Sequence, residues 1–240
     1  MTNQPVLEMS PVALRAEPFE HICKQDFIRP DVYAGLESSY PVCPPSTGPT
    51  GFSYYWGDPE YDRLLQEQPA WKAFFEAAHC QEFVDACIRQ FAPAFEARGC
   101  PINLGKAVYV AYAESREDKE LRHIRQIRHQ PHELFVRLDV HQGYVGYSRA
   151  VHLDHRRRLL SMLIYFCDQG QMEGGELILH GTRLRVLRPE VARVIPRPNL
   201  MAAFACSDVS FHSVPKIKSQ ASPRNFVQIQ LSSSVDAWPA

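Results

Sequence analysis

The stretch that decides the fold is Val151–Cys167, VHLDHRRRLLSMLIYFC, in which a polar cluster leads directly into a run of β-forming residues. His152 and Asp154 lie two positions apart, so in extended backbone their side chains point to the same side of the chain. Burying an imidazole beside a carboxylate is costly unless both groups gain a partner. A bound metal ion would be such a partner, and the stretch therefore predicts a metal site.

The overall composition is typical of a globular protein. The chain has 240 residues, of which 45% are hydrophobic and 22% charged, and its formal net charge is -1. Proteins that bind nucleic acids usually carry a clear excess of Lys and Arg, so the composition argues against a nucleic-acid partner. It contains no indication of the oligomeric state.

The cysteine spacing and the N-terminal sequence indicate the cellular compartment. Seven cysteines occur without any CxxC spacing, which indicates free thiols in a reducing environment. The N-terminus lacks a basic start followed by an apolar run, and no 18 consecutive apolar residues occur. We therefore expect a cytoplasmic protein with no membrane partner.

Short β-prone segments, separated by Gly and Pro, dominate the second half of the chain. Within Leu134–Val140 every second residue is aliphatic, from Leu134 to Val140, and these residues share one face. The other face carries Phe135, Arg137 and Asp139, which predicts a strand buried on one side. The other predicted strands are Leu159–Cys167, Glu176–His180, Ala192–Ile195, Leu200–Cys206, Ser210–Val214 and Arg224–Leu231. This many short strands favours a sandwich or jelly roll in which two sheets enclose a site.

Helices are expected in the first half. We predict one at Val32–Ser39, one that starts at Pro69, and one through Phe83–Phe95, all packing on the sheet. Two further segments remain, one rich in proline and one highly charged, and the charge pattern of the second is compatible with a solvated helix or a mobile loop. The proline-rich stretch Pro41–Pro49 is expected to be an ordered loop, and the charged Glu114–His132 segment a solvated insert or a lid over the site.

Two more residues extend the predicted metal site. His212 lies in a strand near the end of the β region, and Arg224 begins the last strand, twelve residues later. A lone histidine in a strand is commonly a hydrogen-bonded core residue. An arginine that faces the interior of a β-sandwich, however, needs an anion, and a dicarboxylate would suit its bidentate geometry.

These motifs, in their order, resemble a known family. His152-x-Asp154, Tyr165 at a strand end, Gly174-Gly175, His212-Ser-Val214 and Arg224 are similar to the Fe(II)/2-oxoglutarate-dependent oxygenase superfamily, in its prolyl-hydroxylase-like branch. The resemblance spans about residues 135–231. It implies a mainly β fold with flanking helices (α+β): a double-stranded β-helix, a cupin-like jelly roll, with N-terminal helices packed on its major sheet. We expect a single domain over 1–240, with a helical support region at 1–104 and the β-helix core at 105–234.

The resemblance also implies roles for single residues. His152, Asp154 and His212 would bind Fe(II), Arg224 would pair with the far carboxylate of 2-oxoglutarate, and Tyr165 would donate a hydrogen bond to that carboxylate. No catalytic residue is expected beyond these ligands. The implied enzyme is a dioxygenase that uses O₂ and hydroxylates an unactivated C–H bond, with release of succinate and CO₂. The expected substrate is a small molecule, either a free amino acid or a biosynthetic intermediate.

Three alternatives remain at this point. His155 forms a His-x-x-His pair with His152, which is compatible with a zinc or cupin-like site. The same chemistry could serve a protein or peptide hydroxylase, and a non-catalytic jelly-roll module could retain the metal for structure. Substrate contacts are predicted for Arg137, Asp139 and Arg158.

Overall fold

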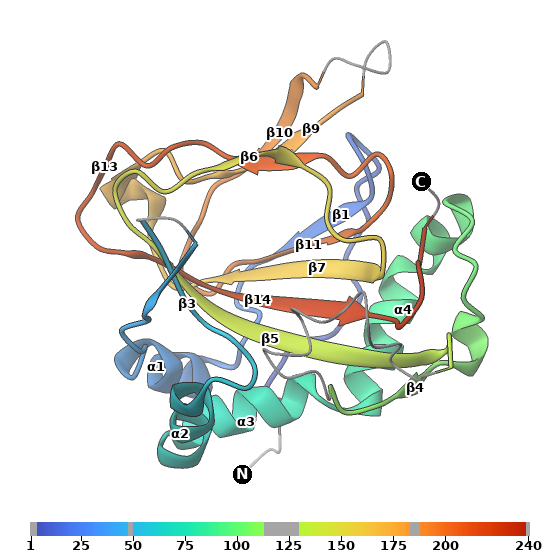
Figure 1. Cartoon of the computed structure of the whole chain (residues 1–240), viewed down its shortest axis with the longest axis horizontal. Coiled ribbons are helices and arrows are strands. Elements are labelled where there is room, and N and C mark those ends of the chain that lie inside the picture. Colours follow the sequence, from blue (N-terminus) through green and yellow to red (C-terminus); the bar gives the residue numbers. More distant parts are fainter. Residues whose placement is uncertain (1–3, 48–49, 113–129, 183–187, 239–240) are drawn as a thin grey trace.

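Two mainly antiparallel β-sheets face one another at the centre of the protein, and helices cover the outer side of the larger sheet (Figure 1). The computed structural model describes residues 4–47, 50–112, 130–182 and 188–238. This arrangement confirms the predicted double-stranded β-helix, mainly β with flanking helices.

The larger sheet has the strand order β1-β11-β7-β14-β5-β3-β2, with β4 beside β5, and the smaller one β10-β9-β12-β6. A separate two-stranded ribbon pairs β13 with β8. The strands are β1 His21–Lys24, β2 Pro45–Thr47, β3 Gly51–Tyr54, β4 Val108–Tyr109, β5 Glu133–Gly143, β6 Arg149–His152, β7 Arg158–Tyr165, β8 Met172–Glu173, β9 Leu177–His180, β10 Glu190–Val194, β11 Met201–Ala205, β12 His212–Val214, β13 Ser219–Gln220 and β14 Arg224–Ser232.

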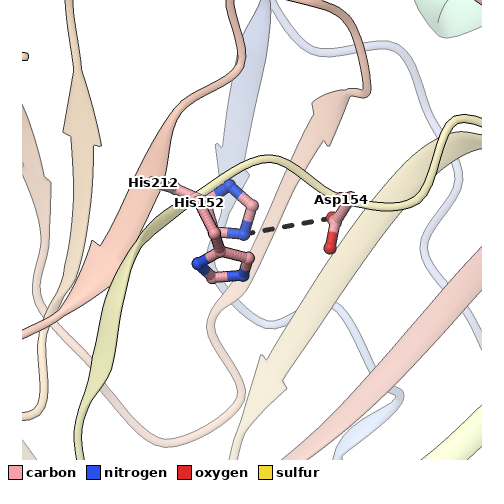
Figure 2. Close-up of side chains that lie close together, drawn as sticks. All are labelled: His152, Asp154 and His212. Carbon is pink, nitrogen blue, oxygen red and sulfur yellow. Dashed lines mark ion pairs between the residues drawn. The ribbon is translucent and has the colours of Figure 1, made fainter.

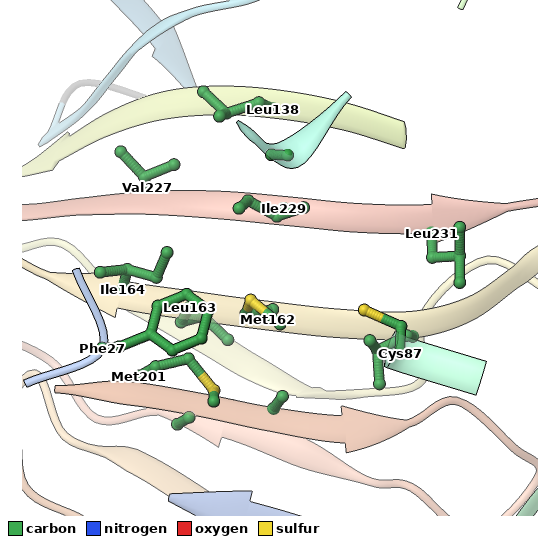
Figure 3. Packing of buried hydrophobic residues seen from close by; sticks show 14 of the residues in the cluster. Phe27, Cys87, Leu138, Met162, Leu163, Ile164, Met201, Val227, Ile229 and Leu231 are labelled. Atoms are coloured by element: carbon green, nitrogen blue, oxygen red, sulfur yellow. The ribbon is translucent and has the colours of Figure 1, made fainter. Parts of the chain in front are cut away.

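The core lies between the larger sheet and the helices. Strand β14 sits between β7 and β5, and its Ile229 is opposite Met162 on one side and Leu138 on the other. These side chains point toward the helical layer, where Cys87 of helix α4 joins the same cluster (Figure 3). The opposite face of the three strands is turned to the smaller sheet, because successive side chains of a strand alternate between its two faces.

The described helices form the support layer predicted for the first half of the chain. They are α1 Pro30–Ser38, α2 Pro59–Glu67, α3 Pro69–Ala78 and α4 Gln81–Ala97, together with the 3₁₀ turns η2 Leu104–Lys106 and η3 Gln169–Gln171. Proline occupies the first turn of α1, α2 and α3, where its missing N–H has no partner to lose. Helix α2 was not predicted; its Tyr61 is fully buried and donates a hydrogen bond to the Leu138 carbonyl at 2.9 Å.

The expectation of a loop without regular structure at Pro41–Pro49 was wrong. Strand β2 lies there and pairs with β3 at the outer edge of the larger sheet. An edge strand forms a ladder on one side only, so proline, which lacks an N–H, is tolerated in it. The backbone also continues the pairing, since Ser53 N–H donates to the Pro44 carbonyl at 2.9 Å.

The expectation that the Leu134–Val140 strand is buried on one side only was also wrong. Strand β5 is buried on both faces, and Asp139 on the polar face is 1% exposed. Arg137 pairs with Asp139 on that face, and the Arg137 guanidinium lies 5.3 Å from the centre of the Tyr55 ring. Most of the predicted lid, Glu114–His132, lies outside the described residues. The division into 1–104 and 105–234 stays a prediction, although β1, β2 and β3 from the first region extend the larger sheet.

None of the described helices has the length and apolar character needed to cross a membrane.

Gly174 allows a test of the fold next to the site. Its φ is +83°, and an added Cβ would meet the backbone carbonyl of Lys216. Gly99 also has positive φ, at +64°, but has open space around it. Both substitutions to alanine carry backbone strain, and only Gly174→Ala adds a clash. We expect Gly174→Ala to lower the free energy of unfolding by about 1–3 kcal/mol more than Gly99→Ala, measured by urea denaturation. Equal losses would contradict this packing.

Candidate metal and cosubstrate site

The pairing of two strands in the smaller sheet brings the predicted metal ligands together. His152 ends β6 and lies opposite His212, which begins β12. Their ring centroids are 4.3 Å apart, and the Nε2 atom of His212 is 3.9 Å from Oδ2 of Asp154 (Figure 2). Each of the three residues offers a ligand atom within 4.8 Å of the other two.

Backbone hydrogen bonds orient both imidazoles. Nδ1 of His152 lies 2.8 Å from the Ala150 carbonyl, and Nδ1 of His212 lies 2.9 Å from the Ser210 carbonyl. A carbonyl oxygen only accepts, so each Nδ1 carries the proton and donates it. Each Nε2 therefore keeps its lone pair, which is the form in which histidine binds a metal. Burial also lowers the pKa of His212, which favours this neutral form.

Arg158 and Ser161 bind the carboxylate of Asp154. Arg158 lies 2.6 Å from Oδ1, and the Ser161 hydroxyl donates to Oδ2 at 2.5 Å. Burial alone would raise the pKa of Asp154, but the Arg158 charge and the Ser161 hydrogen bond hold the pKa well below its usual value. The aspartate is therefore a charged carboxylate, as a metal ligand must be.

Arg224 is a buried cation whose outer nitrogens lack partners. It is 0% exposed, and its Nε donates to the Gly175 carbonyl at 2.6 Å. Both terminal nitrogens have no hydrogen-bond partner among the described residues. The guanidinium lies 4.4 Å from the centre of the Phe226 ring. Since a buried unpaired charge is costly, this geometry fits a site for a bound anion.

Tyr165 adjoins this cation. The Arg224 guanidinium carbon is 5.3 Å from the centre of its ring, and the buried hydroxyl has no hydrogen-bond partner among the described residues. Burial raises the pKa of Tyr165, so its hydroxyl stays protonated and can donate. Tyr165 is not among the residues that line the site cavity, whereas Arg224 is.

A cavity of about 220 Å³ joins the metal cluster to Arg224. Its lining includes Leu163, Leu177 and Phe226, which are apolar, and Gln228, which is polar. Ligand sites in proteins are commonly apolar pockets that contain a few well-placed polar groups. The donor set of two neutral imidazoles and one carboxylate fits Fe(II), and the unpaired guanidinium fits a carboxylate of 2-oxoglutarate.

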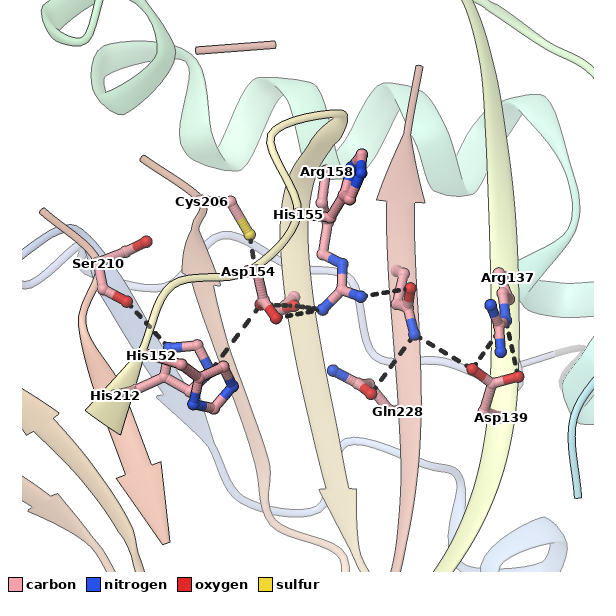
Figure 4. A network of polar contacts seen from close by, with 12 residues as sticks. Arg137, Asp139, His152, Asp154, His155, Arg158, Cys206, Ser210, His212 and Gln228 are labelled. Atoms are coloured by element: carbon pink, nitrogen blue, oxygen red, sulfur yellow. Dashed lines mark hydrogen bonds and ion pairs between the residues drawn. The ribbon is translucent and has the colours of Figure 1, made fainter. Parts of the chain in front are cut away.

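The residues predicted to contact substrate form a chain of polar contacts away from Asp154 (Figure 4). Arg158 donates to Gln230 Oε1 at 2.7 Å, and Gln230 donates to Asp139 at 3.2 Å. Asp139 in turn pairs with Arg137 at 2.8 Å. The structure therefore brings all three residues to the polar face of β5 and β7, and their substrate role stays a prediction.

His155 does not join the cluster. Its side chain is exposed, and its Nδ1 lies 3.3 Å from the Arg157 backbone N–H. The described cluster consists of His152, Asp154 and His212, so the His-x-x-His alternative is not assembled.

The sequence reasoning missed several residues of the cavity wall. They are His141, Tyr147, Arg149, Leu163, Leu177, Val214, Phe226 and Gln228. A signal existed for Gln228, because RNFVQIQLS alternates and puts it on the same face as Arg224. His141 and Arg149 could not be found this way, since nothing local shows that their strands face each other.

Comparison with known families gives the same result as the geometry. Residues 137–229 match the family model described as the 2OG-Fe(II) oxygenase superfamily. The matched segment contains all three candidate metal ligands and Arg224, and in it the protein resembles this superfamily. It is accordingly an oxygenase that works with Fe(II), 2-oxoglutarate and O₂, which confirms the resemblance seen in the sequence. Among curated proteins, none matches the chain.

Solved structures of low sequence identity have a similar fold. An oxidoreductase of the 2OG-Fe(II) oxygenase family from Burkholderia pseudomallei has a TM-score of 0.52 at 10% identity, covering 90% of this chain and 85% of its own. The non-haem alpha-ketoglutarate-dependent epimerase SnoN from nogalamycin biosynthesis has a TM-score of 0.50 at 11% identity, covering 89% and 77%. A Pseudomonas putida prolyl-4-hydroxylase reaches 0.49 at 13% identity, covering 89% and 92%. At such identities the likeness concerns the fold alone.

The pKa of His141 leads to a prediction about stability. Burial, and then the charges of nearby arginines, lowers its pKa from 6.5 to about 3. Below pH 6.5 the His141 side chain therefore binds a proton in the unfolded chain but stays neutral in the folded chain. The contribution of His141 to the free energy of unfolding is complete above pH 6.5 and is lost as the pH falls toward 3.

We expect the free energy of unfolding of the metal-free protein to fall less steeply with decreasing pH in His141→Phe than in the wild type. The difference in slope should be about 1.4 kcal/mol per pH unit between pH 5.5 and 4. Urea unfolding across this range measures it. His155→Asn, at an exposed site, is the control and should keep the wild-type slope; an unchanged slope in His141→Phe would contradict the burial argument.

Proposed function

We propose that the protein hydroxylates an unactivated C–H bond of a small molecule, a free amino acid or a biosynthetic intermediate, with release of succinate and CO₂. His152, Asp154 and His212 would hold Fe(II), and Arg224, assisted by Tyr165, would hold the far carboxylate of 2-oxoglutarate. One observation carries the proposal. The three candidate ligands and a buried guanidinium without an anion line the same cavity.

The size of the cavity supports a small substrate. At about 220 Å³ it is smaller than the roughly 300–1,000 Å³ of sites for drug-sized ligands, and the cosubstrate must share it. A peptide hydroxylase is the alternative within the same chemistry. The free state of all seven cysteines supports a reducing, cytoplasmic location.

Bound iron with 2-oxoglutarate and O₂ supplies the oxidising chemistry, and the protein's own residues prepare the place for it. Arg158 and Ser161 fix the Asp154 carboxylate, so that it need not reorganise when a metal binds. The Gly175 carbonyl holds Nε of Arg224, which leaves its two terminal nitrogens for a bidentate contact. Leu163, Leu177 and Phe226 keep bulk water away from the space between them.

Metal and cosubstrate binding can be separated by two variants. Under anaerobic conditions the wild type with Fe(II) and 2-oxoglutarate should show a visible charge-transfer band, and His212→Ala should lose it. Arg224→Met should keep its affinity for Fe(II), measured by calorimetry without cosubstrate, while its affinity for 2-oxoglutarate drops at least tenfold, because a carboxylate loses a charged partner. A band that persists in His212→Ala would show that the ligands are misassigned.

The substrate class is tested by turnover. With Fe(II), 2-oxoglutarate and O₂, we expect at least one free amino acid or related metabolite to raise succinate formation above the rate without substrate. Peptide libraries should not. Stimulation by peptides alone would replace the small-molecule assignment with the peptide hydroxylase, and 2-oxoglutarate binding without any turnover would favour a non-catalytic module.

A further inference from the structure

Arg149 is an arginine of the cavity wall that the proposed function leaves without a partner. It begins β6, in the smaller sheet, and its side chain lines the cavity at an exposed position. Its Nε donates to the Tyr147 hydroxyl at 3.4 Å. In the part of the chain that the structure describes, no carboxylate forms an ion pair with it. The other two lining arginines differ, since Arg158 pairs with Asp154 and Arg224 is assigned to the cosubstrate.

His141 contributes a second group without a partner, from the larger sheet. It lines the same cavity, is 8% exposed and stacks on Phe226 at 4.8 Å. Its Nδ1 lies 2.6 Å from the Ser53 hydroxyl, whereas its Nε2 is buried without a hydrogen-bond partner among the described residues. In the tautomer in which the Ser53 hydroxyl donates to Nδ1, the ring proton lies on Nε2. A buried donor without an acceptor is costly, so the position favours a ligand that accepts.

The charge of the cavity selects the kind of ligand. Its wall carries three guanidinium groups, those of Arg149, Arg158 and Arg224, against the single carboxylate of Asp154. Fe(II) and 2-oxoglutarate carry equal and opposite charges, so loading the site with both leaves this positive excess unchanged. A cationic substrate would be repelled, and a neutral one would leave the excess positive charge without an anion and Nε2 of His141 without a partner.

We propose that the substrate carries a carboxylate, which the Arg149 guanidinium and Nε2–H of His141 bind in the cavity beside the metal cluster. The inference rests on the proposed function and narrows it to small anionic substrates. Both groups act by binding and orienting the substrate. Arg149 is suited to this task because a guanidinium presents parallel N–H groups to a carboxylate.

The test is a binding experiment that needs no turnover. The protein is loaded with Zn(II), as a redox-inert metal, and saturated with 2-oxoglutarate. The probes are the N-acetyl L-amino acids and short mono- and dicarboxylic acids, each compared with its carboxamide, and the readouts are the melting midpoint and calorimetry. We expect at least one carboxylate to bind at least tenfold more tightly than its carboxamide. If no carboxylate is preferred to its carboxamide, the inference is wrong.

Variants then locate the contact. Arg149→Gln and His141→Phe should each weaken the preferred carboxylate at least fivefold and leave 2-oxoglutarate affinity within twofold of the wild type. Arg197→Gln, at an exposed position outside the cavity, removes the same charge and should change neither affinity. His141→Phe keeps a ring against Phe226, and its unfolding curve shows whether it is folded.

Two other outcomes have distinct meanings. If Arg149→Gln weakens 2-oxoglutarate as much as Arg224→Met does, Arg149 belongs to the cosubstrate site and the inference is overturned. If the wild type with Zn(II) fails to bind 2-oxoglutarate at all, the proposed function itself is overturned, and with it the inference.

Discussion

The pairing register of β14 is the constraint on which the rest of the structure depends. This strand is bonded to β7 on one side and to β5 on the other, so that Phe226 is opposite both Tyr165 and His141. Val227, Ile229 and Leu231 face the helices, and Arg224, Phe226 and Gln228 face the cavity. A shift of one residue would reverse both faces, putting Arg224 into the apolar core. The stability of the core and the position of the site are therefore decided by the same hydrogen-bond ladder.

Among the described residues, two buried ion pairs contrast with the buried cation of Arg224. Asp154 with Arg158, and Asp139 with Arg137, are ion pairs that Gln230 links by hydrogen bonds. Such pairs are tolerated because each charge has a partner where solvent is largely excluded. Arg224 has the hydrogen bond to Gly175 but no anion among the described residues. Binding of a dicarboxylate would remove this cost, so cosubstrate binding and folding stability are coupled.

The fold and the side chains of the site indicate different things about the protein: the fold indicates the superfamily, and the side chains decide the reaction. The double-stranded β-helix supports the superfamily assignment, yet one of the proteins with a similar fold is described as an epimerase. A fold therefore defines where a reaction takes place and leaves its outcome to the side chains around the site. In this chain those side chains include Arg149 and His141, which come from facing sheets and meet the same cavity.

Much of the candidate site was predictable because it is local in sequence. His152 and Asp154 lie within three residues, and the spacing to His212 and Arg224 follows from the order of strands that the family resemblance supplied. The seven strands predicted from Leu134 onward lie within a few residues of observed strands, since alternation and turn residues are local signals. Strand β6, which carries His152, and the short strands β8 and β13 were not predicted. Helix α2 has comparable signals, Pro59 and Tyr61, and was overlooked.

Contacts between distant segments could not be predicted in the same way. The sequence did not predict that Arg137 and Asp139 are buried and form an ion pair with each other. Pro45 was expected in a loop, because its pairing with β3 depends on the folded chain. By itself, the sequence determined most of the strand pattern, the candidate metal-ligand motif and the chemistry that the motif implies. Only the tertiary structure decided which charges form ion pairs and which, like Arg224, lack an anion among the described residues, because burial and ion pairing depend on residues that are far apart in the chain.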